Sequence, residues 1–211
     1  MKANHFFLLL VTLLMGVSCN GVKDNLDGTD DGNGGAAGVD YSDTDQLVWV
    51  DMGTSVLWCT MNLGAERSTD FGTYMEYSNV SGSYGEEFKS CRLPTKADYE
   101  ELATVKTADG KYTPGPCSTK WVKVNGVAGY KYTNKNNGNV IFIPAAGYYG
   151  QGIPYFIGKK VVNWTLDSRQ DQYGLRATTT EFQEGAAPYA GAFAEPYAQY
   201  DRCPMRLVKE K

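Results

Sequence analysis

Short apolar runs, separated by Gly, Pro and Asn, dominate the chain after residue 46. Runs of this length predict short β-strands joined by turns. The expected strands cover residues 47–52, 55–61, 71–77, 119–124, 128–133, 139–143, 161–165, 172–177 and 204–208. Asn125-Gly126 falls between two of these runs and predicts a type I′ hairpin turn. The run 139–143 is almost wholly apolar, so we expect a central strand buried on both faces.

One stretch has the pattern of a helix instead of a strand. Pro94 stops the preceding segment, because proline fixes φ and has no N–H. Thr95 followed by Asp98 is a capping-box pattern at a helix start. The apolar residues that follow lie mostly on one face and end near Val105. One helix within a strand-rich chain predicts the α+β class, with short antiparallel sheets and many loops.

The first 18 residues have the composition of a signal peptide. Residues 6–15 are almost wholly apolar, but this run is shorter than the ~20 residues that span a bilayer. Small residues then precede Cys19, and this order resembles a bacterial lipobox, in which the cysteine is lipidated. The alternative is an ordinary cleaved signal with an incidental cysteine at this position. We expect a lipid anchor at Cys19 to be the only contact with a membrane.

An acidic segment follows the lipidation site. Residues 20–46 contain seven Asp against one Lys and are rich in Gly, so residues 19–46 are expected to form a disordered tether. The whole chain has a formal net charge of −4, whereas residues 47–211 contain 18 Lys and Arg against 17 Asp and Glu. This nearly neutral segment is expected to be one domain. Its lack of a basic run argues against a nucleic-acid partner.

Histidine chemistry is excluded from the mature chain. The only histidine, His5, lies in the predicted signal peptide, which leaves no histidine for a Ser-His-Asp site or a zinc site. We therefore expect no catalytic residues, no metal and no cofactor. Four cysteines remain after Cys19, and in an exported chain an even number favours two disulfides with three possible connectivities. These candidate disulfide residues are Cys59, Cys91, Cys117 and Cys203.

Aromatic residues in the second half of the chain are the candidate ligand-binding residues. They lie in sequence rich in Gly, Ala and Pro, and tyrosine beside small residues is typical of recognition loops. The candidates are Tyr148, Tyr149, Tyr155, Trp164, Tyr189, Tyr197 and Tyr200. The alternative is that half of such residues pack in the core. Trp58, Tyr99 and Trp121 are assigned to the core.

Five segments, in order, resemble the Fibrobacter succinogenes major paralogous domain family. They are Val50–Trp58 with Asn62–Ala65, Cys91–Leu102, Asn125–Thr133, Gly138–Tyr148 and Arg206–Val208. The helix segment also resembles that of formylglycine-generating enzymes, and this implies a C-type-lectin-like fold for residues 47–211. The pattern differs at Met61, where the family often has a cysteine, and residues 159–201 lack the family's usual Tyr-Trp-Ser-Ser-Thr stretch. Two positions along a strand keep the same face, so Cys59 could still form that bridge.

The resemblance implies a location and a disulfide pairing. The family is typical of surface lipoproteins of Bacteroidota-type bacteria, so we expect a lipid-anchored protein of the outer membrane, exposed at the cell surface. Analogy with lectin-like folds implies a Cys91–Cys203 disulfide, which leaves Cys59 with Cys117. The formylglycine-generating activity is not expected, because that chemistry uses a pair of reactive cysteines near the C-terminus and only Cys203 lies there.

These observations favour a non-catalytic binding module over an enzyme. The expected partner is a glycan or a surface protein, recognised through the aromatic loops. The alternative is a structural or adhesive subunit, or a diversified ligand-display protein, of the outer-membrane surface. A calcium-dependent sugar site is disfavoured, because Glu195-Pro196-Tyr197 lacks the asparagine of such sites.

Overall fold

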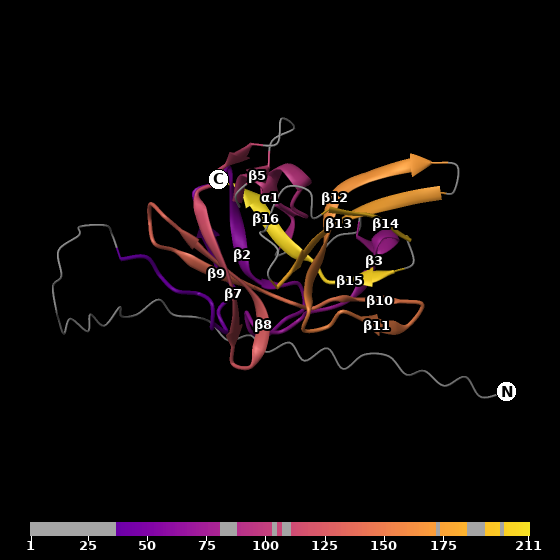
Figure 1. The fold of residues 1–211 in the computed structure, drawn as a ribbon, viewed down its shortest axis with the longest axis horizontal. Coiled ribbons are helices and arrows are strands. Elements are labelled where there is room, and N and C mark those ends of the chain that lie inside the picture. Colours follow the sequence, from indigo (N-terminus) through magenta and orange to yellow (C-terminus); the bar gives the residue numbers. More distant parts are fainter. Residues whose placement is uncertain are drawn as a thin grey trace. The chain divides into compact units, whose positions relative to one another are not determined.

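Antiparallel strands and loops make up most of the described chain, in agreement with the expected α+β class (Figure 1). The computed structural model describes residues 37–80, 88–102, 105–106, 111–171, 174–184, 193–198 and 201–211. Within these residues α1 (Lys96–Leu102) is the α-helix, and η1 (Tyr77–Asn79) is a short 3-10 turn. The first strands are β1 (Trp49–Asp51), β2 (Val56–Asn62), β3 (Met75–Glu76), β4 (Cys91–Arg92), β5 (Val105–Lys106), β6 (Tyr112–Thr113), β7 (Cys117–Val124) and β8 (Val127–Asn134). The others are β9 (Val140–Pro144), β10 (Tyr148–Gly150), β11 (Ile153–Tyr155), β12 (Lys160–Asp171), β13 (Gly174–Gln183), β14 (Phe193–Ala198), β15 (Arg202–Cys203) and β16 (Arg206–Glu210).

The strands form several small sheets instead of one large sheet. Their orders are β1-β2-β16-β4, β11-β10-β15-β3, β12-β13-β14, β7-β8-β9 and β5-β6. The expected turn at Asn125-Gly126 is present, because both residues have positive φ angles, 48° and 82°. None of the expected strands covers residues 181–201, but these residues contain the end of β13 and all of β14. No helix among the described residues is long and apolar enough to cross a membrane.

The sheet β1-β2-β16-β4 separates two hydrophobic cores. Successive residues of a strand point to opposite faces, so β2 contributes Trp58 to the first core and Cys59 to the second. In the same way β16 contributes Val208 to the first core and Leu207 to the second. The first core also contains Tyr99, whose ring lies 5.0 Å from that of Trp58. This confirms the core assignment of Trp58 and Tyr99, and Trp121 packs against the same core while only partly buried.

Strand β9 is buried along its whole length, as its apolar sequence predicts. It is not central, however, because it lies at one end of the sheet β7-β8-β9. Residues 39–41 cover part of its outer edge. Val140 N donates to Val39 O (3.0 Å), and Tyr41 N donates to Val140 O (2.9 Å). An uncovered strand edge is a template for pairing with another chain, so this segment protects β9.

Residues 37–46 are therefore ordered against the fold, whereas the sequence places them in the disordered tether. Ser42 is buried, and its carbonyl accepts a hydrogen bond from Ser68 Oγ (2.9 Å). Asp43 pairs with Arg67 at 2.8 Å. Composition alone misjudged this part, because its carboxylates are matched by basic side chains that are distant in the sequence. The rest of the predicted tether, with Cys19 and the signal peptide, lies outside the described residues.

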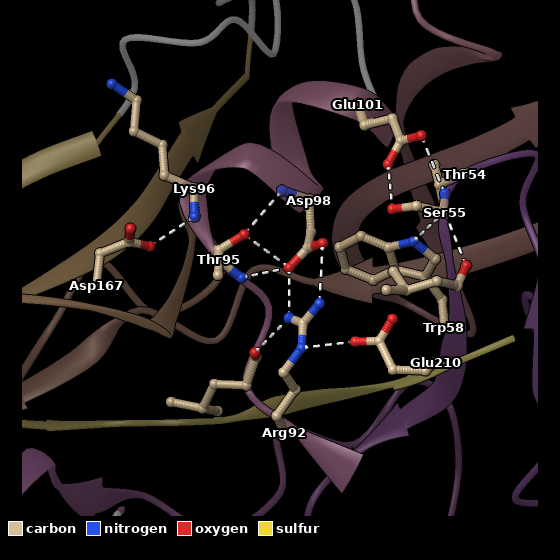
Figure 2. A network of polar contacts seen from close by, with 12 residues as sticks. Thr54, Ser55, Trp58, Arg92, Thr95, Lys96, Asp98, Glu101, Asp167 and Glu210 are labelled. Carbon is tan, nitrogen blue, oxygen red and sulfur yellow. Dashed lines mark hydrogen bonds and ion pairs between the residues drawn. The ribbon is translucent and has the colours of Figure 1, made fainter. Parts of the chain in front are cut away.

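Thr95 and Asp98 cap the start of α1, as the sequence predicts (Figure 2). Asp98 N donates to Thr95 Oγ1 (3.1 Å), and Thr95 N donates to Asp98 Oδ2 (2.6 Å). This reciprocal pair satisfies two backbone donors at the helix start. The described helix ends at Leu102, and Val105 belongs to β5 instead of to the end of the helix.

Two further contacts join α1 to distant segments. Glu101 accepts hydrogen bonds from both the backbone N and the Oγ of Ser55, in the turn between β1 and β2. Lys96 N donates to Asp167 Oδ2 of β12 at 2.6 Å. Figure 2 shows that the two partners of the helix, Ser55 and Asp167, come from different elements. The network therefore positions one short helix against two distant parts of the chain, which is a structural role.

Arg206 joins the sheet β1-β2-β16-β4 to β9. Its side chain is fully buried, Nη1 donates to Cys59 O (2.9 Å) and Nη2 donates to Phe142 O (3.0 Å). No carboxylate pairs with it among the described residues, and burial lowers its pKa. The guanidinium thus satisfies one carbonyl on each of two strands that belong to different sheets.

The four described cysteines are free, which corrects the expected disulfides. Cys59 and Cys117 cannot pair, because they belong to the two cores on opposite faces of one sheet. The alternative pairing of Cys59 with Cys91 fails for a different reason. Strand β16 lies between β2, which carries Cys59, and β4, which carries Cys91. The Cα atoms of the two cysteines are therefore at least two strand spacings apart, roughly 9.6 Å. A disulfide requires Cα atoms within about 6.8 Å.

The pairing implied by lectin-like folds, Cys91 with Cys203, is also not formed. Cys91 lies on β4 and Cys203 on β15, and these strands belong to separate sheets. Burial raises the pKa of all four thiols, most clearly for Cys203 and for Cys117, where it reaches about 12. Such thiols are protonated at neutral pH and behave as small apolar groups.

Candidate functional site

The hairpin of β10 and β11 holds three of the sequence-predicted ligand-binding residues. Gln151 and Gly152 connect its strands with φ angles of 50° and 82°. Two positive φ values in a two-residue connection correspond to a type I′ turn. The register pairs Tyr148 with Tyr155, so their side chains lie on the same face. Residues 148–156 are called the aromatic hairpin below.

The rings of the aromatic hairpin contact one another. Tyr148 and Tyr155 are stacked, with centroids 5.2 Å apart and an interplanar angle of 17°. Phe156 lies 6.3 Å from Tyr148 and 6.4 Å from Tyr155. These rings therefore form one continuous group and not three separate side chains.

This group reaches solvent. Ile153, Tyr155 and Phe156 are 56%, 39% and 43% exposed. They account for half of the exposed large hydrophobic side chains in the described part of the chain, and the others are Val39, Leu47 and Leu166. Single exposed apolar residues are ordinary on a protein surface, but a cluster indicates an interaction site.

Two cationic side chains border the hairpin. Lys160 Nζ lies 4.2 Å above the centroid of the Phe156 ring, and Arg202 Cζ lies 5.8 Å from that of Tyr149. Both distances are within the range of cation–π attraction. Lys160 therefore places positive charge beside the exposed rings, whereas Arg202 lies against Tyr149, whose side chain is on the opposite face of the hairpin from Tyr148.

The half-buried Tyr74 packs against the hairpin. The Tyr74 ring meets that of Tyr149 edge to face at 4.9 Å, and its hydroxyl donates to Ala146 O (2.5 Å). Burial raises the pKa of Tyr74, so this hydroxyl stays protonated and remains a donor at neutral pH. The contact joins β10 to the segment before β3.

Phe156 has an unusual backbone conformation. Its φ angle is 56°, in the left-handed region that bulky residues avoid, at a cost of order 1–3 kcal/mol. Its carbonyl is held in place because it accepts backbone hydrogen bonds from Lys159 N (2.9 Å) and Lys160 N (3.0 Å). Strained residues of this kind gather at functional sites. A partly exposed ring on such a backbone position is a second, independent feature of the aromatic hairpin.

Gly147 allows the segment before β10 to lie close to the backbone after β11. Its φ angle is 57°, and a Cβ atom at this position would overlap the carbonyl oxygen of Tyr155 and the backbone of Phe156. Only glycine leaves room for this approach. Gly147 therefore determines how the exposed rings are placed relative to the core.

The other candidate ligand-binding residues are not part of this group in the described structure. Trp164 is a correction, because it is fully buried and its Nε1 donates to Met75 O (2.7 Å). It packs against Tyr77 in the second core, so it is not available to a ligand. Tyr197 lies on β14, where only the backbone is described. Tyr189 and Tyr200 lie outside the described residues.

Several residues of the site could not be predicted from the sequence. Ile153 and the two cations, Lys160 and Arg202, carry no motif, because their role depends on neighbours that the fold brings together. Tyr74 lies more than 70 residues before Tyr149 in the chain. A partial indication was present in the Gln151-Gly152 dipeptide, which is compatible with a tight hairpin turn between two tyrosine-rich segments.

Several of the described carboxylates are engaged in structural contacts. Four aspartates have a pKa below the ordinary value, namely Asp40, Asp43, Asp51 and Asp98. In each, a hydrogen bond from a lysine or arginine favours the charged form. Burial raises the pKa of Asp40 and Asp98, but the lysine or arginine together with hydrogen bonds from Ser42 to Asp40 and from Thr95 to Asp98 outweighs burial. These four groups stay ionised at neutral pH, so none of them is suited to act as a general acid. Within the described residues, no three His, Cys, Asp or Glu side chains come together as metal ligands.

Comparison of the chain with models of protein families, with curated proteins and with solved structures found no match.

Proposed function

We propose that this protein is a non-catalytic binding module that recognises a glycan through the aromatic hairpin. The observation that carries the proposal is the clustering of exposed apolar side chains in residues 153–156. The C–H face of a sugar ring is apolar, and an exposed aromatic ring offers a flat apolar surface of matching size. The strained position of Phe156 supports the same assignment, because a protein retains backbone strain where it serves a function.

The location and family of the protein belong to the same proposal and rest on the sequence. We propose a C-type-lectin-like domain of the Fibrobacter succinogenes major paralogous type, anchored through a lipid on Cys19 and exposed on the outer membrane. The small antiparallel sheets and the short helix are compatible with this fold. A binding surface held at the end of a lipid-anchored segment would face the surroundings of the cell.

A glycan array probed with the full-length protein tests the function. We expect binding that persists in EDTA and that weakens at least about tenfold in Phe156→Asn, a loss of about 1.4 kcal/mol. Asparagine tolerates a positive φ angle, so this variant removes the ring and keeps the backbone conformation. Leu166→Asn is the matched control, because Leu166 is also exposed (47%) but lies outside the hairpin.

Three results would contradict the proposal. The full-length protein binds no glycan, or Phe156→Asn binds as tightly as the unaltered protein, or Leu166→Asn loses as much affinity as Phe156→Asn. Binding that EDTA abolishes would instead support a calcium-dependent site elsewhere in the chain.

The exposure of Ile153 favours a second candidate function. Its aliphatic side chain is the most exposed large hydrophobic group in the hairpin and does not supply a flat ring for stacking on a sugar. A structural or adhesive subunit would use such a residue in a protein contact. Sedimentation of the full-length protein and of Ile153→Ser separates the two functions. Self-association that is lost in Ile153→Ser would favour the assembly role, and a monomer in both cases would favour the glycan-binding role.

A further inference from the structure

A polar surface, separate from the aromatic hairpin, lies on the β7–β8 hairpin in a different sheet. The register of these strands places Lys120 directly opposite Lys131, and Ser118 opposite Thr133. The neighbouring positions Tyr130 and Tyr132 belong to the first core, so the positions on either side of them face outward. An open groove, called the lysine groove, lies over this outward face and is lined by Ser118, Lys120, Val122, Lys131 and Thr133, together with Thr119, whose partner Tyr132 belongs to the core.

The charges of the groove are only partly balanced. Two like charges directly opposite each other on antiparallel strands destabilise a sheet. Lys131 is compensated by Asp40, whose Oδ2 lies 2.6 Å from its Nζ. Lys120 is exposed and forms no ion pair within the described part of the chain. Asp40, which lies at the outer edge of β9 and not among the lining residues, therefore neutralises Lys131, while Lys120 across the strand pair stays unpaired.

The contact between Asp40 and Lys131 shows how an anionic group of a ligand would bind at this surface. Its other oxygen, Oδ1, accepts a hydrogen bond from Ser42 N (2.9 Å), so the carboxylate is held in place from the edge of the sheet. Burial raises the pKa of Asp40, but Lys131 and the hydrogen bonds from Ser42 together outweigh burial and keep this pKa below its ordinary value. The surface thus accepts an anionic oxygen in hydrogen-bonding geometry.

We propose that the lysine groove binds a carboxylated or sulfated glycan. The two ammonium groups match the acidic groups of such a chain, and the hydroxyls of Ser118 and Thr133 match its sugar hydroxyls. This site goes beyond the function proposed above, because it shares no residue with the aromatic hairpin and needs a charged ligand.

The position of the groove argues for a glycan over other anionic partners. A peptide usually binds a sheet by pairing with a strand edge, whereas this groove lies on the face of the sheet, where side chains are the available partners. A nucleic acid requires many phosphate contacts, and residues 47–211 carry a net charge of only +1. Two lysines with several hydroxyls suit a ligand of low charge density with many hydroxyl groups.

Binding of the full-length protein to polygalacturonate and heparin, with neutral dextran as the reference, tests the proposal. We expect binding to at least one acidic polysaccharide, none to dextran, and a loss of at least about tenfold in Lys120→Gln. Lys123→Gln is the control and should change affinity less than about twofold. Lys123 is exposed on the same strand but lies opposite Ala128, a core residue, so its side chain is on the other face of the sheet.

Two further variants sharpen the test. Asp40→Asn removes the internal carboxylate and should tighten binding, because both lysines then become available to the ligand. Lys131→Gln should weaken binding, and its melting temperature must be measured because it also loses the contact with Asp40. Lys120→Gln loses no contact that the structure describes, so it tests the groove without this complication.

Several results would overturn the proposal. These are the absence of binding to both acidic polysaccharides, an equal loss in Lys123→Gln and Lys120→Gln, or equally tight binding of poly-glutamate. Phe156→Asn separates this site from the aromatic hairpin, because it should leave binding to the acidic polysaccharides unchanged. A loss in Phe156→Asn as large as that in Lys120→Gln would place the acidic ligand on the hairpin and overturn a separate site.

Discussion

Arg206 illustrates how single residues hold this fold together. A fully buried guanidinium costs free energy unless its donors are satisfied, and here two of its donors reach the carbonyls of Cys59 and Phe142. Those carbonyls lie on strands of two different sheets. The residue therefore acts as a polar connection between sheets, at a position where an apolar side chain would remove a donor from both carbonyls.

We predict that Arg206→Met destabilises the protein by about 2–5 kcal/mol, because two buried carbonyls lose their donors. Urea denaturation followed by tryptophan fluorescence measures this change. Arg202→Met is the control, because Arg202 is exposed and its cation–π contact with Tyr149 contributes about 0.5–1 kcal/mol. Equal destabilisation by the two substitutions would show that Arg206 has no special role.

Gly147 determines the geometry of the candidate site in the same local way. We predict that Gly147→Ala destabilises the protein by about 1–3 kcal/mol, since alanine at a positive φ is strained and its Cβ would overlap the backbone of residues 155–156. Gly152→Ala serves as the control. Gly152 also has a positive φ (82°), but no atom lies within 4 Å of the Cβ position. Thermal unfolding should show a larger loss for Gly147→Ala, and an equal loss would mean that backbone strain alone accounts for it.

At the scale of elements, α1 depends more on its capping residues than on its own length. A helix of seven residues is too short to be stable alone, so tertiary contacts must fix it. Asp98 provides the capping contact with Thr95 and also accepts from Arg92 Nη1 at 2.6 Å. Arg92 in turn reaches Glu210 of β16 at 3.1 Å, so the helix start is linked to the first sheet (Figure 2).

Acid should therefore weaken the attachment of α1. Burial raises the pKa of Asp98, but the hydrogen bonds from Arg92 and Thr95 outweigh it and the folded-state pKa lies below the ordinary value. The stability that this carboxylate contributes is present above the unfolded-state pKa of about 3.9 and is lost as pH falls through the lower folded-state pKa. We predict that Asp98→Asn costs about 1–3 kcal/mol at pH 7 and that the gap to the unaltered protein narrows as pH falls below about 4. Denaturant unfolding from pH 7 to pH 2.5 measures the difference in the free energy of unfolding between the two proteins. A difference that does not change with pH would contradict the role of the charge.

At the scale of the whole molecule, two cores lie on either side of the sheet β1-β2-β16-β4. Residues 37–46 pack on the fold, and part of this segment pairs with the outer edge of β9 in another sheet. This arrangement makes the N-terminal segment part of the folded unit. Residues 39–41 pair with β9, Ser42 is buried, and Asp40 contacts the lysine groove. Stability and the proposed anion site are thus connected through the same short segment.

We predict that a chain beginning at residue 47 is less stable than one beginning at residue 37 by at least about 2 kcal/mol, because several buried hydrogen bonds are lost. Hydrogen exchange should show the largest loss of protection at Val140, whose backbone N donates to Val39 O. A chain beginning at residue 30 is the control and should match the one beginning at residue 37. Equal stability of all three would mean that residues 37–46 do not contribute to the fold.

The sequence by itself determined the elements whose causes are local. The capping residues of α1, the Asn125-Gly126 turn and the burial of β9 follow from contacts or apolar runs within a few residues. Tertiary structure decided everything that depends on which distant residues meet. Trp164 became a core residue because the fold places Met75 O opposite its indole N–H. Cys59 is kept from Cys117 by the sheet between the two cores and from Cys91 by β16 between their strands. Residues 37–46 became ordered because distant basic side chains pair with their carboxylates. The aromatic hairpin and the lysine groove are of this second kind, because exposure and pairing depend on strand register and packing, which a single sequence does not state.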